Sequence, residues 1–226
     1  MAHLLHLDSS PRSFPGTLNG HQSVTRMLTQ EFVTAWQAAH PDETVMYRDI
    51  GRNPIPPVSE EWIAAAYTPP EQRSPELAAA LKISDELVDE FLRADICVFG
   101  IPMYNFSVPS TFKAYIDQIV RVGRTFTIDA NGFEGLAVGK QIIVITARGG
   151  SFRPGTSLAA YDHQEPYLRT IFKFIGIADV HFIHADRLNP IVNDESTRNQ
   201  SIAKARAATK EVALLGSELA GANSKF

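Results

Sequence analysis

The sequence of 226 residues contains very little cysteine and no large excess of charge of either sign. Cys97 is the only cysteine, which excludes an intrachain disulfide framework and is typical of a reducing compartment. The formal net charge is −4 and like charges form no blocks, so the sequence does not indicate binding to nucleic acid or to an anionic membrane surface. We therefore expect a cytoplasmic protein with neither kind of partner.

Long apolar runs and the common nucleotide motifs are also missing. The apolar runs are shorter than a membrane span, and the N-terminus lacks the basic-then-apolar pattern of a signal peptide. There is no G-x-G-x-x-G and no G-x-x-x-x-G-K-[ST], so neither a Rossmann dinucleotide site nor a P-loop is indicated. There is also no G-x-S-x-G, and no Ser-His-Asp arrangement can be read.

Metal and thiol chemistry are not expected either. His3 with His6, and His181 with His184, are three residues apart, which on a strand directs the two rings to opposite faces. Cys97 lies within the apolar stretch "DICVFG", which favours a buried structural thiol over a nucleophile.

What the sequence does contain is a regular alternation of strand and helix patterns. Apolar segments predict five strands at 3–8, 44–50, 95–101, 140–147 and 178–185. Helical periodicity predicts helices at 23–39, 75–94, 110–122, 165–176 and 194–219, with Ser110 as an N-cap, Gly176 as a stop and a frayed tail from 220 to 226. A connection with six prolines, 51–75, contains the short apolar piece "EEWIAAAY". This alternation predicts one doubly wound α/β domain, residues 1–226, with a parallel sheet.

In such a sheet, ligands bind beyond the carboxyl ends of the strands, at the point where the strand order reverses. The loop after the first strand carries hydroxyl residues, and Ser23 and Thr25 open a helix, which together can bind a phosphate without lysine. The alternative is that Ser23 only caps the helix and the other hydroxyl residues, Ser9, Ser10 and Thr25, are ordinary loop polar residues.

The loops after the third and fourth strands have a different composition. In "PMYNF", Met103, Tyr104 and Phe106 could form a wall against a flat conjugated ring, or could be core or subunit-interface residues. In "ARGG", Gly149 and a second glycine after it allow the backbone to approach a ligand closely. The neighbouring Arg148 could equally be a surface or ion-pair arginine.

Together these segments resemble the FMN-dependent NADH-azoreductases, which are also NADH:quinone oxidoreductases, in the flavodoxin-like superfamily. The resemblance covers nearly the whole chain, through "SSPR", "SVTRMLTQEFVTAW", "SDELVDEF", "PMYNFSVPSTFKAYID", "NGFEGLAVGK", "VITARGG" and "FIGIADV". It implies a flavodoxin-like fold with a five-stranded parallel sheet of order 2-1-3-4-5 and helices on both faces. It also implies a homodimer with FMN sites at the interface.

The resemblance also assigns residues to the flavin. It implies a phosphate cradle, a wall that holds the isoalloxazine ring, and a loop that completes the polar edge of the ring. These sets are, in that order, Ser10, Ser23, Val24 and Thr25; Met103, Tyr104, Asn105 and Phe106; and Ala147, Arg148, Gly149 and Gly150. Two departures stand out: the family usually has a serine where this chain has Ala147, and the loop between Pro11 and Gln22 is longer than usual.

The chemistry follows from the cofactor, because FMN carries the hydride and the protein supplies binding and orientation. We expect a ping-pong cycle in which NADH or NADPH reduces the flavin and a quinone or azo compound then accepts two electrons. No side chain is assigned a catalytic role, and His163 is either a substrate contact or a solvated loop residue. The alternatives are a flavodoxin-type electron carrier that binds FMN without turnover, and a flavin-free interaction module with the same fold.

Overall fold

The computed structural model describes residues 2–16, 22–130 and 132–222. Strands and helices alternate along these residues, joined by short loops and two 3-10 helices. The strands are β1 (His3–Asp8), β2 (Thr44–Asp49), β3 (Ile96–Pro102), β4 (Phe126–Asp129), β5 (Gly132–Gly135), β6 (Gln141–Ala147) and β7 (Asp179–Ala185). The helices are α1 (Val24–Ala39), α2 (Glu60–Tyr67), α3 (Pro75–Ala80), α4 (Lys82–Arg93), α5 (Ser110–Ile119), α6 (Glu165–Phe174) and α7 (Glu195–Ala222), with 3-10 helices at Pro70–Gln72 and Ala159–Tyr161.

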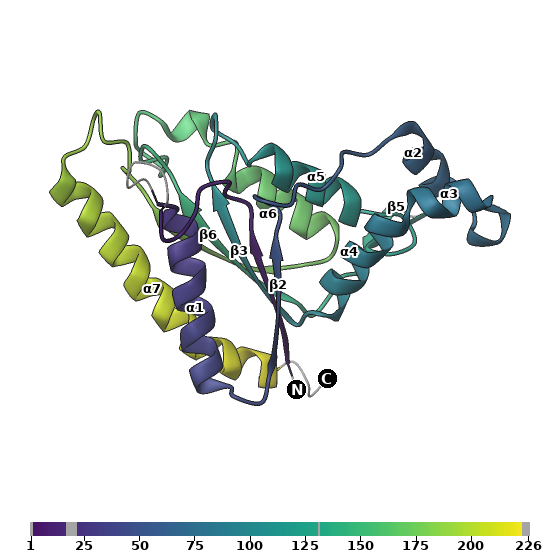
Figure 1. Ribbon diagram of the computed structural model, residues 1–226, viewed down its shortest axis with the longest axis horizontal. Helices are drawn as coiled ribbons and strands as arrows, with labels where there is room; N and C mark the ends of the chain where they lie inside the picture. Colours follow the sequence, from purple (N-terminus) through teal and green to yellow (C-terminus); the bar gives the residue numbers. More distant parts are fainter. Residues whose placement is uncertain (1, 17–21, 131, 223–226) are drawn as a thin grey trace.

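Five strands form one parallel sheet in the order β2-β1-β3-β6-β7 (Figure 1). Counted among themselves, these are the first to fifth strands in the order 2-1-3-4-5, so the expected topology is confirmed. The strand order reverses between β1 and β3, which pair in parallel from Leu4 opposite Ile96 to Asp8 opposite Gly100. The connections from these two strands leave in opposite directions along the sheet, which opens a crevice at their carboxyl ends.

Helices cover both faces of the sheet, and alternate residues of each strand pack against each layer. Leu5 and Leu7 face the cluster formed with α4, α5 and α6, whereas Leu4 faces the cluster formed with α1 and α7. Figure 1 shows α1 and α7 side by side on one face and the other three helices on the opposite face. Because both faces are covered, the central strands β3 and β6 are buried along nearly their whole length and read as continuous apolar runs.

Cys97 of β3 confirms the expectation of a structural thiol. Its side chain is fully buried in the cluster on the α4, α5 and α6 side of the sheet. Burial raises the pKa of the Cys97 thiol to about 12, so it is protonated and unreactive at neutral pH.

The prediction of one continuous helix over 75–94 is wrong. The chain breaks at Leu81, which ends α3 and precedes α4. Leu81 is buried in a small cluster with Trp62 of α2, whereas Leu87 and Phe91 of α4 face the main sheet. The apolar residues of 75–94 therefore serve two separate cores, and no single straight helix could bury both sets.

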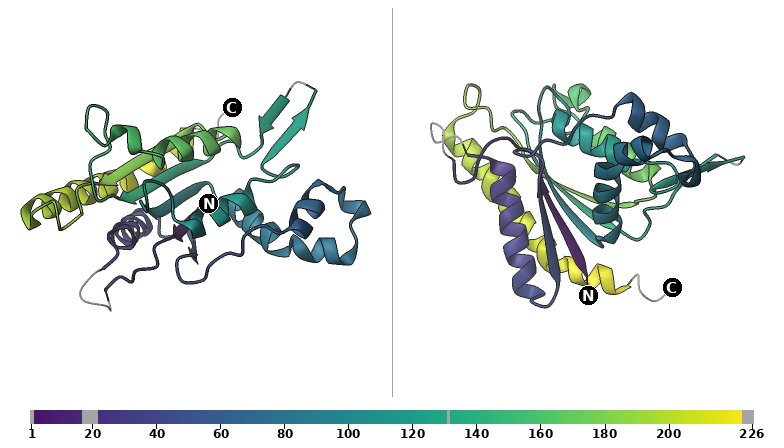
Figure 2. Two further views of the ribbon diagram at one scale, coloured as in Figure 1. Left: turned by 90° about the horizontal axis from the view of Figure 1, so that it is seen from above. Right: turned by 45° about the vertical axis from the view of Figure 1, so that its right-hand side comes forward.

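The structure also differs from the prediction by an additional hairpin and by the ends of two helices. The chain between α5 and β6 forms an antiparallel hairpin, β4–β5, that the sequence reading did not anticipate and that projects from the sheet (Figure 2). Ser110 is the first residue of α5 rather than its N-cap, and the helix ends at Ile119 instead of 122. The frayed tail expected from 220 is not found at 220–222, because α7 continues to Ala222; residues 223–226 lie outside the described residues.

The described residues contain neither a membrane-spanning helix nor a group of side chains suited to a metal ion. None of the helices is both long enough and apolar enough to cross a bilayer. Within the described ranges, histidine, cysteine and acidic side chains form no group of three or more suited to hold a metal ion.

Candidate functional site

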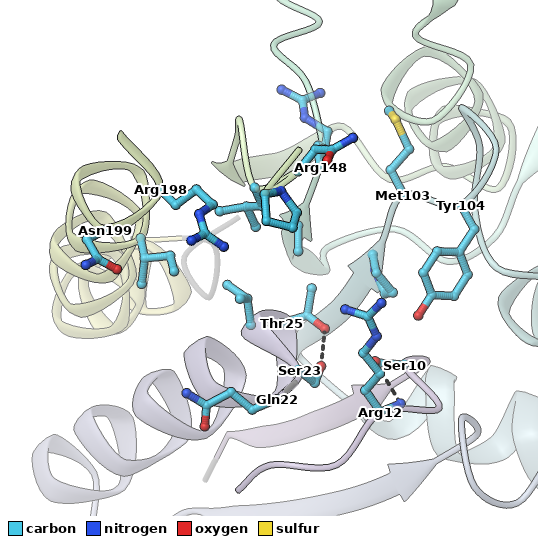
Figure 3. A pocket seen from close by; sticks show the side chains of 18 of the residues that line it. Ser10, Arg12, Gln22, Ser23, Thr25, Met103, Tyr104, Arg148, Arg198 and Asn199 are labelled. Carbon is cyan, nitrogen blue, oxygen red and sulfur yellow. Dashed lines mark hydrogen bonds between the residues drawn. The ribbon is translucent and has the colours of Figure 1, made fainter. Parts of the chain in front are cut away.

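A cavity of about 570 Å³ lies at the carboxyl edge of the sheet, where β1 and β3 diverge. This size is within the range of about 300–1,000 Å³ that is usual for small-molecule and cofactor sites. Its walls come from the start of α1 and the segment before it, the segments that follow β1, β3, β6 and β7, and the first turns of α7 (Figure 3). The lining residues are Ser10, Arg12, Gln22, Ser23, Val24, Thr25, Pro102, Met103, Tyr104, Ala147, Arg148, Gly149, Leu188, Asn189, Pro190, Glu195, Arg198, Asn199 and Ile202.

The segment after β1 is held in place by the buried Arg26. Its Nε and Nη2 atoms donate to the carbonyl oxygen of Ser10 over 3.0 and 2.5 Å, and Nη2 also donates to Asp49 Oδ1 over 2.5 Å. Burial alone would lower the pKa of Arg26, but the hydrogen bond to Asp49 and the charge of Asp8 raise it overall. A Cβ at Gly51 would lie 2.2 Å from the Ser10 carbonyl oxygen, so only glycine allows this close approach.

The start of α1 forms the floor of the cavity. The buried Ser23 caps the helix, because its Oγ accepts from the Arg26 amide over 3.3 Å, and it also lies 3.1 Å from Thr25 Oγ1. The capping alternative for Ser23 is therefore realised. The amides of Val24 and Thr25 still have no acceptor within the helix, because they belong to its first turn. These amides, the hydroxyls and the positive end of the helix dipole form a donor set suited to a phosphate.

The loop after β3 forms a tight and strained turn. Tyr104 and Ser107 exchange backbone hydrogen bonds of 3.0 and 3.1 Å, with Asn105 and Phe106 between them at φ values of 48° and 70°. Positive φ at both central residues is typical of a type I′ turn, a conformation that a bulky residue such as phenylalanine disfavours. The Phe106 ring lies 5.3 Å from that of Tyr161, which helps to hold the turn. Such outliers cost about 1–3 kcal/mol each and cluster at functional sites.

The loop after β6 approaches the cavity with its backbone. The Met103 amide donates to the Ala147 carbonyl over 3.0 Å, so the loops after β3 and β6 are tied together. A Cβ at Gly149 would find only Asn189 Cβ within 4 Å, at 3.5 Å. The main chain at Gly149 is therefore open to close approach by a ligand.

Arg148 is among the residues that line the cavity, but its guanidinium is used in a buried ion-pair cluster. The guanidinium is 1 % exposed and donates from Nε to Asp186 Oδ1 over 2.7 Å and from Nη1 to Asp162 Oδ2 over 3.1 Å. The ion-pair alternative for the side chain is thus what the structure contains. The cluster fixes the loop after β6 against the loops that precede α6 and follow β7.

The cavity brings together most of the residues that the sequence predicted. Those that line it are Ser10, Ser23, Val24, Thr25, Met103, Tyr104, Ala147, Arg148 and Gly149. Three predicted residues are not among the lining residues: Asn105, Phe106 and Gly150. Asn105 and Phe106 form the turn that supports Tyr104, and Gly150 packs against Leu158, which would lie 2.4 Å from an added Cβ.

Sequence reasoning missed one wall of the cavity, formed by Leu188, Asn189 and Pro190 after β7 and by the start of α7. The rule for doubly wound sheets directed attention to loops near the strand reversal, and the loop after the fifth strand lies farther along the sheet. It reaches the cavity because α7 packs beside α1, with Arg206 Nε 2.8 Å from Glu31 Oε2. The sequence could have indicated this wall, because every loop that follows a strand of a parallel sheet begins at the same edge of the sheet.

His163 is exposed and is not among the residues that line the cavity. Its backbone amide donates to the Phe106 carbonyl over 3.1 Å, so the residue supports the turn after β3 through its main chain. The structure therefore gives no contact between the His163 ring and the cavity.

The fold and the position of this cavity define a flavodoxin-like protein. A family model described as "Flavodoxin-like fold" matches residues 2–212. The chain is 57 % identical over 211 residues to an FMN-dependent NADH:quinone oxidoreductase of Nostoc punctiforme, covering 93 % of this chain and 98 % of the relative. It is 56 % identical over 209 residues to FMN-dependent NADH:quinone oxidoreductase 2 of Trichormus variabilis, with coverages of 92 % and 96 %.

Among solved structures, the chain is similar to an azoreductase from Bacillus anthracis, with a TM-score of 0.84 and 25 % identity. The alignment covers 95 % of this chain and 99 % of the other. The chain therefore belongs to the flavodoxin-like family that includes the FMN-dependent NADH:quinone oxidoreductases.

The residues of the cavity fit FMN. Ser23, Thr25 and the first-turn amides of α1 match the needs of a phosphate monoester, and the cavity size suits one flavin mononucleotide. At the other end, Met103 and Tyr104 supply apolar and aromatic surface, and the open backbone at Gly149 supplies polar groups for the edge of a flat ring.

Proposed function

We propose that this protein is an FMN-dependent oxidoreductase that transfers two electrons from NADH or NADPH to quinones and aromatic azo compounds. The observation that carries this proposal is one cavity with a phosphate-type donor set at one end and an apolar wall beside open backbone at the other. It is supported by the names of close relatives, which are FMN-dependent NADH:quinone oxidoreductases.

When bound, FMN supplies the ability to accept a hydride and pass on two electrons. We assign the protein's residues to binding and orientation. Ser10, Ser23, Val24 and Thr25 hold the phosphate; Met103, Tyr104, Ala147, the Arg148 main chain and Gly149 face the ring; and Asn105, Phe106 and Gly150 support these loops. No side chain is proposed as a nucleophile, a general acid or a general base.

Two aromatic side chains of the loop after β3 are exposed, which gives them a second role. Tyr104 is 36 % exposed and Phe106 44 % exposed, so an aromatic surface stands beside the mouth of the cavity. A flat substrate that stacks there would exclude water from the reacting face, which strengthens the hydrogen bonds that orient the ring.

The alternative of a flavodoxin-type carrier has less support. Such carriers dock on basic partners through strong negative charge, whereas this chain has a formal net charge of −4 over 226 residues. The relatives with 56–57 % identity are named as oxidoreductases that use NADH and quinone. A carrier without turnover therefore remains only as an outcome of the test below.

We further propose that residues 1–226 form one FMN-binding domain and that the protein is a cytoplasmic homodimer. The single, buried Cys97 fits a reducing compartment. Exposed apolar side chains gather on two parts of the chain that project beyond the sheet on the same side (Figures 1 and 2). These are Ile63 and Tyr67 of α2, and Ile128 and Phe133 of the hairpin. Such patches are typical of protein interfaces, and light scattering after size exclusion would measure the mass in solution.

Purification followed by a visible spectrum and turnover assays tests the proposed function. We expect a yellow protein that oxidises NADH or NADPH with a quinone and with methyl red, with parallel lines in double-reciprocal plots. A flavin-loaded protein without turnover would favour the carrier, and a colourless protein that cannot be loaded with FMN would contradict both.

A further inference from the structure

Two of the arginines that line the cavity form no ion pair with a carboxylate of the described residues, unlike the arginines that hold its walls in place. Arg26 and Arg148, which brace its walls, are each paired with carboxylates. Arg12 and Arg198 also line the cavity, yet none of the carboxylates in the described residues lies within ion-pair distance of either. The Arg198 Nε atom donates to the Asp194 carbonyl over 3.4 Å. The charge of Arg198 also contributes to lowering the pKa of the exposed Asp194 carboxyl, but the two side chains do not form an ion pair.

Arg198 lies at the phosphate-binding end of the cavity. It belongs to the first turns of α7, which packs along α1 so that both helices begin at the same edge of the sheet (Figure 1). In Figure 3 the guanidinium groups of Arg198 and Arg12 approach from opposite sides the space above Ser23 and Thr25. Met103 lies across the cavity, on the side assigned to the ring.

The charge balance of this end favours an anion. Glu195 is the acidic side chain among the lining residues, and it is outnumbered by Arg12 and Arg198. The start of α1 adds the positive end of its dipole. A phosphate monoester carries a charge of about −1.5 to −2 at neutral pH, which this set would neutralise. A guanidinium also offers two parallel donors that match phosphate oxygens.

We propose that Arg198 is a binding residue for the phosphate of FMN and gives the cavity its preference for FMN over riboflavin. This inference rests on the proposed function, because it takes FMN as the ligand. Neither the position of Arg198 on the last helix nor its sequence context marks it as a flavin contact. Its role follows from the packing of α7 against α1 and from the guanidinium forming no ion pair with a carboxylate of the described residues.

The test compares two flavins that differ only in the phosphate. The full-length protein, freed of flavin, is titrated with FMN and with riboflavin while flavin fluorescence is followed, at low and at high salt. The variants are Arg198→Met, Arg198→Lys and, as a matched control, Lys204→Met, which removes an exposed charge of the same helix outside the cavity.

We expect Arg198→Met to weaken FMN binding by about ten- to a hundredfold, as for the loss of one charge-assisted hydrogen bond, with riboflavin affinity unchanged. The salt dependence of FMN binding should also decrease, Arg198→Lys should recover part of the affinity, and Lys204→Met should resemble the wild type. Equal weakening of both flavins would indicate a structural role and overturn the inference. Unchanged FMN affinity with a raised KM for NADH or NADPH would assign Arg198 to the donor and overturn it as well.

Failure of the proposed function would give a different result. In that case the wild-type protein itself would bind FMN no better than riboflavin, or would bind FMN without turnover. The ratio of FMN to riboflavin affinity in the variants tests Arg198 separately from turnover.

Discussion

Two arginines of the same cavity, Arg148 and Arg198, show how differently one residue type is used here. Arg148 is 1 % exposed and held between Asp162 and Asp186. Arg198 is half-buried, forms no ion pair with a carboxylate of the described residues and faces the cavity. The first arginine shapes the backbone around the ligand, and the second has donors left for the ligand itself.

The same contrast holds on the other side of the cavity. Arg26 binds the Ser10 carbonyl and Asp49, so its charge is fully used within the protein. Arg12 is exposed and without a carboxylate partner in the described part of the chain. The paired arginines hold the backbone around the cavity in place before a ligand binds, and the arginines without ion pairs lie at its edge. Binding then orders fewer groups, so it loses less conformational entropy.

The largest expected effect on stability is that of removing a paired arginine. Arg148→Met would leave Asp162 without this buried partner and Asp186 with only the exposed Arg153, and we expect a loss of about 3 kcal/mol in the free energy of unfolding. Arg198→Met should change it by less than about 0.5 kcal/mol. Urea unfolding of both variants measures the difference, and similar losses would show that the distinction between the two arginines is wrong.

Glycines make the next comparison, since two of them are in equally close contact with backbone. A Cβ at Gly51 would lie 2.2 Å from the Ser10 carbonyl oxygen, and one at Gly135 would lie 2.1 Å from the Gly176 nitrogen. We expect Gly51→Ala and Gly135→Ala each to cost about 1–3 kcal/mol, as overpacked sites do. Only Gly51→Ala should also weaken FMN binding, because Ser10 would have to move. Equal FMN affinity in the two variants would argue against the assigned phosphate site.

An ion pair outside the cavity gives a prediction about pH. The hydrogen bond from His184 is the largest cause that lowers the pKa of Glu165 from 4.5 to about 2; burial opposes it, and Arg169 adds to the lowering. Because the folded pKa is depressed, this stabilisation is present above about pH 4.5 and is lost as the pH falls toward 2. Between pH 5 and pH 3, the wild type should lose at most about 2 kcal/mol more than Glu165→Gln. Unfolding curves at both values measure this, and parallel losses would contradict it.

The smallest effect is expected at the surface. Lys113 and Asp117 form an exposed pair at i and i+4 on α5, with Nζ 2.6 Å from Oδ1. Lys113→Ala should cost only about 0.3–0.5 kcal/mol and leave flavin affinity unchanged. A loss above 1 kcal/mol in urea unfolding would contradict this, because it would mean that an exposed ion pair stabilises the fold as strongly as a partly buried one.

The sequence predicted the strands and the helix start that position the cavity, but not all of the residues that line it. The five strands of the parallel sheet and the start of α1 at Ser23 were predictable, because strand patterns and a capping serine are local signals. The break at Leu81 was not, because its cause is a contact with Trp62 far back in the chain. The same holds for Arg198, which reaches the cavity only through the packing of α7 on α1.

The paired and unpaired arginines could not be separated from sequence either. Arg148 pairs with Asp162 and Asp186, which are 14 and 38 residues away, and the residue type alone does not reveal such partners. The strained turn at Asn105 and Phe106 was invisible for a similar reason, since Phe106 would not be expected at a positive φ.

A crystal structure of the FMN-loaded protein tests the central claim most directly. The account predicts phosphate oxygens within hydrogen-bond distance of the Val24 and Thr25 amides, with the ring between the Met103–Tyr104 segment and the backbone at Gly149. A flavin phosphate bound away from the start of α1, or a flavin outside this cavity, would contradict it.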